Sequence, residues 1–266
     1  MYSSKAAYGV ITMAEDFLSG VEQKVVNVGD LKVKLPVVIR DSRLLAIYFL
    51  APVKRLRRLL PDGFAPAQMF PGSGLVQLTV YEHRDSDIGP FNEFSVVIPL
   101  YSPQFPKLPF YNFYKATSTS QTYNFLLHRA ADAEVAVRVL DEHFLYPEFT
   151  ASIEFTESDD WLTGEVKESG DLICRLRGRK ILAQRSTISR ISIYTPRNQQ
   201  PNRGDIDFKQ FAMTRDSSSA ELTLGSSHPI ARELSETLKS TKSSMYAYAP
   251  SCQMFMNERE ESPGPS

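Results

Sequence analysis

The sequence contains only two cysteines, Cys174 and Cys252, among 266 residues. Two cysteines provide neither a disulfide framework nor the ligands of a cysteine-based zinc site. The chain also lacks a phosphate-binding loop, a Gly-Xaa-Gly-Xaa-Xaa-Gly fingerprint and a Gly-Xaa-Ser-Xaa-Gly motif, so nucleotide chemistry and serine hydrolysis have no motif support. We therefore expect neither a metal nor any other cofactor.

Long apolar runs are missing as well. No stretch approaches the roughly 20 apolar residues of a membrane helix, and the first residues carry no secretory signal pattern. The formal net charge of -1 provides no electrostatic attraction to nucleic acid or to an anionic membrane. These absences predict a cytoplasmic protein whose partner is a small molecule, with no nucleic acid and no membrane partner.

What the sequence does contain is a series of short segments typical of strands. Strand patterns occupy residues 43–50, 75–81 and 93–100 in the first half, and period-two segments occupy residues 151–156, 161–166, 172–176, 187–194 and 220–224 further on. Helical spacing of apolar residues predicts short helices at residues 53–60, 132–144 and 230–238.

Many short strands with few helices predict a mostly β protein with a few helices, of the α+β kind. A curved antiparallel sheet that closes into a β-barrel removes exposed edges and surrounds a ligand cavity. With no internal repeat and no clear linker, residues 1–266 are expected to form a single domain. We expect residues 1–30 to be an N-terminal extension and residues 258–266 a disordered tail.

Five local motifs follow one another along the chain: Asp41-Ser42-Arg43, Leu59-Leu60-Pro61, Gly89-Pro90-Phe91-Asn92-Glu93, Tyr146-Pro147 and Gly225-Ser226-Ser227-His228-Pro229. In this order and spacing, the sequence resembles acetoacetate decarboxylase and its relatives from about residue 35 to residue 257. The resemblance implies the same fold and a small-molecule site, while function has to be argued from the site itself.

Decarboxylating members of that family bind a keto group as an imine on a lysine. The resemblance places this lysine on Glu148 and its lysine neighbour on Phe149. A family glutamate falls on Thr79, whereas Arg43 and Glu93 match the family's remaining pocket arginine and glutamate. A carboxylate cannot form an imine, so the resemblance implies a member without the Schiff-base lysine.

Glu148 and Glu93 are the predicted catalytic residues. Glu148 follows Tyr146-Pro147 and precedes Phe149, so a position inside a dry cavity would raise its pKa and suit it to acid–base work; the alternative is a solvated edge glutamate. Glu93 is interpreted as a pocket acid or as a cap of the preceding turn.

Arg43, Thr79 and Phe149 are the predicted substrate-binding residues. A guanidinium forks onto a carboxylate, which suits Arg43 to an acidic substrate; the alternative is a surface arginine beside Asp41.

The sequence thus favours a lyase-like, cofactor-free enzyme that acts on a carbonyl- or carboxylate-containing molecule by a lyase, dehydratase, isomerase or cyclase step. Two alternatives stay open. One is a non-catalytic protein that binds a small molecule in the same cavity. The other is a true β-keto acid decarboxylase with a relocated lysine such as Lys115 or Lys180. The aromatic-rich residues 105–114 also predict an interface of a homo-oligomer.

Overall fold

The structure is a computed structural model that describes residues 17–146, 148–181, 188–197, 200–209 and 212–257. The predicted tail at residues 258–266 and residues 1–16 of the predicted extension lie outside these ranges. Residues 17–30 of that extension include β1, which pairs with β2 in a small antiparallel sheet. Their bounds are Lys24–Val28 (β1) and Leu31–Leu35 (β2).

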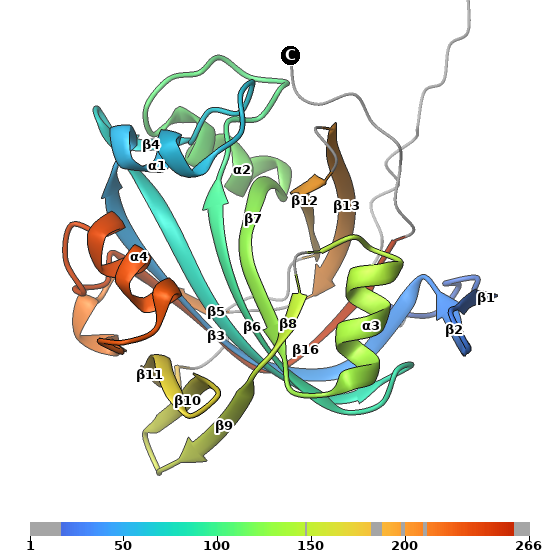
Figure 1. Cartoon of the computed structure of the whole chain (residues 1–266). Coiled ribbons are helices and arrows are strands. Elements are labelled where there is room, and N and C mark those ends of the chain that lie inside the picture. Colours follow the sequence, from blue (N-terminus) through green and yellow to red (C-terminus); the bar gives the residue numbers. More distant parts are fainter. Residues whose placement is uncertain (1–16, 147, 182–187, 198–199, 210–211, 258–266) are drawn as a thin grey trace, which may run out of the picture.

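Seven strands form a closed β-barrel in the order β12-β13-β16-β3-β5-β6-β7, and a parallel pairing of β7 with β12 completes the circle (Figure 1). The predicted barrel is therefore confirmed. The bounds are Val37–Pro52 (β3), Ser73–Ser86 (β5), Phe91–Pro99 (β6), Gln121–Ala131 (β7), Ile188–Arg197 (β12), Gln200–Lys209 (β13) and Met245–Met256 (β16). Three short strands extend it: Gln68–Phe70 (β4), Glu148–Thr150 (β8) and Ala212–Thr214 (β14).

A second antiparallel sheet has the order β15-β11-β10-β9. Its strands are Ser152–Glu157 (β9), Trp161–Glu168 (β10), Asp171–Arg179 (β11) and Ala220–Leu224 (β15). The first three follow one another as a meander, as the period-two segments predict. Gly170, at a φ of 88°, supplies the left-handed backbone that the tight turn between β10 and β11 requires.

Four helices occur in the described ranges: Val53–Leu59 (α1), Tyr111–Thr119 (α2), Glu134–Glu142 (α3) and Pro229–Thr237 (α4), together with a 3₁₀ turn at Ser217–Ser219. The three predicted helices correspond to α1, α3 and α4. Pro229 at the first turn fits the start of α4, where His228 accepts a hydrogen bond from the Ile230 N–H. Figure 1 shows α1 and α2 at one end of the barrel, with α3 beside β8 nearer the other end.

The two faces of the barrel strands bury different cores, because side chains alternate along a strand. On β3, Leu45, Ile47 and Phe49 belong to a cluster that also contains residues of the second sheet and of α1 and α4. Leu44 and Ala46 belong to another cluster, with residues from β6, β7, β12, β13, β16 and the buried stripe of α3. The first cluster lies on the outer face of the barrel strands, and the second lies on their inner face and extends to α3, β1 and β2.

Candidate active site inside the barrel

Four titratable side chains meet on the inner face of four consecutive strands of the sheet: His83 on β5, Glu93 on β6, Arg129 on β7 and Glu148 on β8. The strand register produces this meeting, because Arg129 lies directly beside Glu148 in the parallel pair of β7 and β8. Neighbouring side chains at such paired positions share a face of the sheet.

The turn that leads from α3 into β8 directs Glu148 to this place. Leu145 has a φ of 57°, and the Tyr146 N–H donates a hydrogen bond to the Leu140 carbonyl oxygen at 3.0 Å. The end of the helix is thus followed by a left-handed residue and by a hydrogen bond back to its last turn. Pro147, which the sequence motif includes, lies outside the described residues.

Arg129 is the centre of the cluster. Its guanidinium forms a direct ion pair with Glu93, and its Nε lies 3.4 Å from Oε2 of Glu148. The side chains of Arg129 and Glu93 are 5% and 6% exposed, and that of Glu148 is 0% exposed. Burial at this level weakens solvent screening, so each charge acts strongly on its neighbours.

Aromatic rings hold the cluster in place. His83 Nε2 lies 3.4 Å from Oε2 of Glu93, and its ring lies between Tyr81, stacked at 5.3 Å, and Phe91, at 4.4 Å. On the other side, Arg129 Cζ lies 4.7 Å from the centre of the Tyr146 ring, a cation–π distance. The polar groups are therefore fixed by packing as well as by charge.

The two carboxyl groups have opposite protonation behaviour. Burial raises the pKa of Glu148 to about 8; the charge of Arg129 lowers it and that of Glu93 raises it further. Burial also acts to raise the pKa of Glu93, but the charge of Arg129 and the contact with His83 outweigh it and hold that pKa below its usual value. At neutral pH, Glu148 is therefore mainly a neutral acid, while Glu93 is an ionised partner of Arg129.

Glu148 also has unused hydrogen-bonding capacity. Neither of its carboxyl oxygens has a hydrogen-bond partner among the described residues, and the same holds for Arg129 Nε and His83 Nδ1. Buried polar atoms are usually satisfied. The cluster therefore contains four buried polar atoms with unused hydrogen-bonding capacity.

Glu93 and Glu148, predicted as the catalytic pair, are thus brought into one cluster with Arg129. Thr79 lies on the same inner face, because its strand partners Ala46 and Ser95 do. It is fully buried and accepts a hydrogen bond from the side-chain amide of Gln77 at 2.9 Å.

The prediction that Arg43 shares this site needs correction. Arg43 is paired with Glu82, and Glu82 with Asn92. These residues alternate with Leu44, Tyr81 and Glu93, so Arg43 points to the outer face of the barrel.

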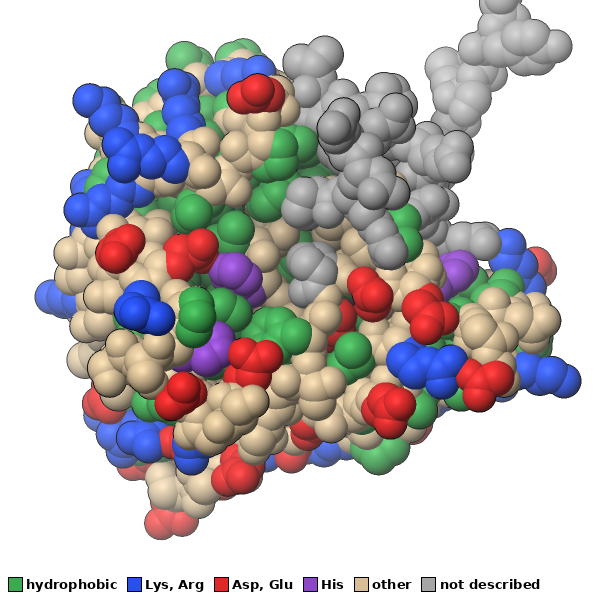
Figure 2. Space-filling model, viewed as in Figure 1, with side chains coloured by type: hydrophobic (Ala, Val, Ile, Leu, Met, Phe, Trp, Pro, Cys, Tyr) green, Lys and Arg blue, Asp and Glu red, His purple; other side chains and the backbone are tan. Residues whose placement is uncertain are grey.

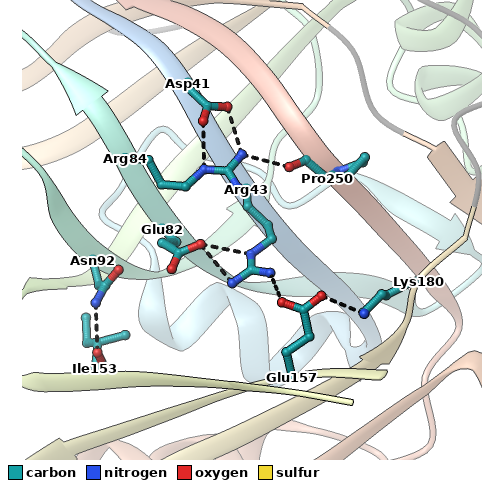
Figure 3. A network of polar contacts seen from close by, with 9 residues as sticks. All are labelled: Asp41, Arg43, Glu82, Arg84, Asn92, Ile153, Glu157, Lys180 and Pro250. Carbon is teal, nitrogen blue, oxygen red and sulfur yellow. Dashed lines mark hydrogen bonds and ion pairs between the residues drawn. The ribbon is translucent and has the colours of Figure 1, made fainter. Parts of the chain in front are cut away.

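Figure 3 shows what Arg43 does there. Its guanidinium binds Glu82 at 2.9 Å and Glu157 of β9 at 2.5 Å, and Glu157 also pairs with Lys180. The network joins the barrel to the second sheet. Asp41, the partner considered for Arg43, pairs instead with Arg84 at 2.7 Å.

The prediction that Phe149 binds the substrate is corrected as well, because this side chain also lies on the outer face. It follows Glu148 on β8, so its side chain points the other way and packs against the outer cluster. Neither Arg43 nor Phe149 contacts the buried acids.

Sequence reasoning missed Arg129 and His83. Arg129 lies in β7, a strand without a marked alternating pattern in the sequence. His83 lies on β5 two residues after Tyr81, and continuing that period-two pattern would have placed it on the same face as the pocket residues.

Neither lysine considered for a relocated imine lies in the cluster. Lys180 pairs with Glu157 at 2.5 Å on the outer side, and the Lys115 ammonium lies 5.7 Å from the ring centres of Phe105 and Tyr111 near α2. No lysine within the described ranges is buried.

Two further searches covered the described part of the chain. No helix in it is both long and apolar enough to cross a membrane. No group of three or more His, Cys, Asp or Glu side chains in it is arranged to hold a metal ion.

An open groove of about 820 Å³ lies on the surface where β8 and β9 meet the turn after β10. Its lining includes Asp132, Thr150, Ser152, Lys167 and Gly170, and none of the four clustered residues. An enclosed cavity around the cluster stays a prediction.

A closed seven-stranded barrel whose inner face carries a buried cluster of charged side chains defines the class of fold. The sequence profile of the family described as acetoacetate decarboxylase (ADC) matches residues 30–189, more than half of the chain. The chain therefore belongs to the acetoacetate decarboxylase family, as the motifs predict.

Solved structures show the same fold at low sequence identity. The acetoacetate decarboxylase from Legionella pneumophila subsp. pneumophila str. Philadelphia 1 is similar with a TM-score of 0.58 and 12% identity, over 85% of this chain and 86% of that chain. A second acetoacetate decarboxylase structure is similar with a TM-score of 0.60 and 13% identity, over 85% of this chain and 88% of that chain. The structure of the enduracididine biosynthesis enzyme MppR, complexed with pyruvate, is similar with a TM-score of 0.54 and 10% identity, over 84% of this chain and 88% of that chain. No curated protein sequence matches the chain.

Proposed function

We propose that this protein is an acetoacetate decarboxylase-like enzyme that acts on a carbonyl- or carboxylate-containing small molecule by acid–base chemistry, without a lysine imine. The observation that carries the proposal is Glu148: a fully buried carboxyl group beside an Arg–Glu ion pair, where the resemblance places the imine-forming lysine. The reaction is a lyase, dehydratase, isomerase or cyclase step.

Glu148 is the proton carrier. In its neutral form it transfers its proton to the carbonyl oxygen of the substrate. The carboxylate that remains, beside Arg129, then takes a proton from the adjacent carbon, which leaves the enol and restores the neutral acid. A group with a pKa of about 8 suits both directions of this transfer near neutral pH.

Arg129 and Glu93 support that cycle. The guanidinium stabilises the carboxylate that forms transiently on Glu148, and it stays charged throughout. Glu93, ionised and bound to Arg129 and His83, fixes the position of the guanidinium. Glu93 is therefore a positioning residue in this scheme rather than a second proton carrier.

The absence of an imine is supported by the residues at hand. A reactive lysine needs a desolvated or cationic environment that lowers its pKa, and the described lysines are all at least partly exposed. Lys115 and Lys180 are held by partners outside the cluster.

The test is α-proton exchange in heavy water, followed by proton NMR with methyl 4-oxopentanoate and 4-oxopentanoate as probes. The wild-type protein is expected to catalyse exchange, and Glu148→Gln to slow it by about 10²-fold or more. The matched control is Glu154→Gln, an exposed glutamate on β9, which should exchange at the wild-type rate.

A parallel incubation with borohydride and intact-mass analysis tests for an imine. An unmodified mass with both probes is expected. A lysine adduct, or an unchanged exchange rate in Glu148→Gln, would overturn the proposed mechanism. Tight binding of either probe with no exchange would favour the non-catalytic binding protein instead.

The proposal includes a cytoplasmic homo-oligomer. Leu108, Phe110 and Tyr114, all within the aromatic-rich residues 105–114, are 54%, 46% and 60% exposed. Clustered exposed apolar side chains are typical of an interface. Sedimentation analysis of the wild type and of Tyr114→Ser tests it: the wild type should be larger than a monomer and the variant smaller than the wild type.

A further inference from the structure

The inner face of the barrel carries a line of uncharged polar side chains that leads to the cluster. Thr79 lies opposite Ser95 and Tyr81 lies opposite Glu93 in the register of β5 and β6. Gln77, next along the same face, is half-buried, whereas Thr79 and Ser95 are buried. The line therefore runs from a partly exposed end of the interior to the buried acids.

The neighbouring strand contributes similar groups. Asn124 of β7 is buried beside Ile193 of the inner core, and its side-chain amide donates to Thr122 Oγ1 at 3.3 Å. Hydroxyl and amide groups bind neutral polar ligands through hydrogen bonds without adding charge to the site.

The buried positive charge of the cluster is balanced within the cluster. Within the described ranges, Arg129 is the one lysine or arginine that is buried, and its charge is already matched by Glu93. With Glu148 neutral, the charges of Arg129 and Glu93 cancel. The other basic side chains lie elsewhere; Figure 2 shows lysines and arginines gathered over α1, which contains Arg57 and Arg58.

A carboxylate ligand fits such an interior poorly. It would bring an additional negative charge into a buried site where the available cation is already paired, and an uncompensated buried charge is strongly unfavourable. A carbonyl group needs only hydrogen-bond donors. The carboxyl group of Glu148 and Nε of Arg129, 3.4 Å from its Oε2, both lack hydrogen-bond partners among the described residues.

We propose that the barrel interior selects an uncharged carbonyl compound, such as a ketone or keto ester, over the corresponding keto acid, with Glu148 and Arg129 donating hydrogen bonds to its carbonyl oxygen. This substrate class rests on the proposed function, because it concerns the same site. It differs from the acid-binding role expected of Arg43, which lies on the outer face.

The test compares pairs of probes, each a carboxylate and its uncharged methyl ester: pyruvate with methyl pyruvate, 4-oxopentanoate with methyl 4-oxopentanoate, and 2-oxo-2-phenylacetate with its methyl ester. Dissociation constants are measured at pH 7 by calorimetry or by ligand-observed NMR, independently of turnover. Each ester is expected to bind at least about tenfold more tightly than its acid. Equal or tighter binding of the acids, or no binding of any ester up to about 10 mM, overturns the proposal.

The double variant Glu93→Gln/Glu148→Gln tests the cause of the preference. Both groups are replaced because the charge of Arg129 lowers the pKa of Glu148 and the charge of Glu93 raises it, so Glu148 would ionise beside Arg129 if Glu93 alone were removed. With no carboxylate left beside Arg129, the ratio of the two dissociation constants should move at least about tenfold towards the acid, relative to Glu148→Gln alone. Glu82→Gln, on the opposite face of the same sheet, is the matched control and should keep the wild-type ratio. An unchanged ratio in a folded double variant would contradict the charge argument.

The two proposals fail separately. If the esters bind selectively but undergo no exchange in heavy water, the substrate class stands and the catalytic proposal falls. If the acids bind more tightly and exchange through Glu148, the catalytic proposal stands and the substrate class falls.

Discussion

Arg129 and Glu148 face each other across the parallel pair of β7 and β8, with Nε of the guanidinium 3.4 Å from Oε2 of the carboxyl group. Two opposite charges this close would ordinarily form a strong ion pair. Here Arg129 already forms an ion pair with Glu93, so its guanidinium does not compensate fully for the burial of a second carboxylate. The result is one ionised and one neutral carboxyl group around a single arginine.

The pH profile of α-proton exchange follows from that neutral group. If the reaction begins with the proton on Glu148, the rate should be constant on the acidic side and fall about tenfold per pH unit above about pH 8. Measuring the exchange rate of methyl 4-oxopentanoate between pH 6 and pH 10, two limits chosen about two units either side of that pKa, checks it. A rate that rises through pH 8 would show that the carboxylate, rather than the acid, begins the reaction.

Stability should also respond to Glu148. Its pKa is about 8 in the folded protein against a model value of 4.5, so between these values the unfolded chain loses a proton that the folded protein keeps. The folded state therefore loses stability as pH rises from about 4.5 to 8, by roughly 5 kcal/mol in total, and no further above that.

Urea denaturation at several pH values measures this contribution. The free energy of unfolding of Glu148→Gln, relative to the wild type, should increase across the same pH window, while Glu154→Gln, exposed on the surface, should follow the wild type. Parallel pH curves for the wild type and Glu148→Gln would mean that Glu148 is ionised in the folded protein at neutral pH.

Most of the architecture was predictable because its signals are local. The alternation in residues 161–166 and 172–176 predicts β10 and β11, and the apolar stripe of residues 132–144 predicts α3. Strand β7 was missed because its two halves change face at a bulge near Leu126 and His128, which breaks the period of two. β13, rich in polar residues, has no clear apolar face in the sequence.

The site was less predictable, since it depends on which face a residue takes. Arg43 and Glu93 both stand beside apolar strand residues, and only the pairing of Tyr81 with Glu93 and of Glu82 with Arg43 separates them. A shift of one residue in register exchanges the two faces. The position of Arg129 depends on the register of β7 with β6 and β8, so no local pattern marks it.

Replacing Arg129 or Arg43 by methionine distinguishes the inner face of the barrel sheet, which carries Arg129, from the outer face, which carries Arg43. Arg129→Met leaves Glu93 buried without its cation and should lower the free energy of unfolding by about 3–5 kcal/mol, with loss of α-proton exchange. Arg43→Met removes a partly exposed network with Glu82 and Glu157 and should lower it by about 1 kcal/mol or less.

For Arg43→Met, the measurement that decides is the rate of α-proton exchange. The folded variant should exchange α-protons at the wild-type rate, because the side chain lies on the other face of the sheet. If the folded Arg43→Met protein does not catalyse α-proton exchange, Arg43 takes part in the reaction, and the assignment of the active site to the inner face is contradicted.

Gly204 of β13 offers a way to disturb the cluster without changing its charges. A Cβ atom at Gly204 would lie 2.7 Å from the hydroxyl oxygen of Tyr146, whose ring packs on Arg129 at 4.7 Å. Gly204→Ala should therefore displace the ring and the guanidinium, and lower the exchange rate by about tenfold or more, since a small misplacement of catalytic groups is costly.

A matched glycine and a rescue separate this effect from general loss of stability. Gly178→Ala crowds the hydroxyl of Tyr246 on the outer face and should reduce stability while leaving exchange by the folded protein unchanged. Adding Tyr146→Phe to Gly204→Ala removes the crowded hydroxyl and should restore most of the exchange rate. If the double variant stays as slow as Gly204→Ala although it is folded, the position of Arg129 does not depend on the Tyr146 ring.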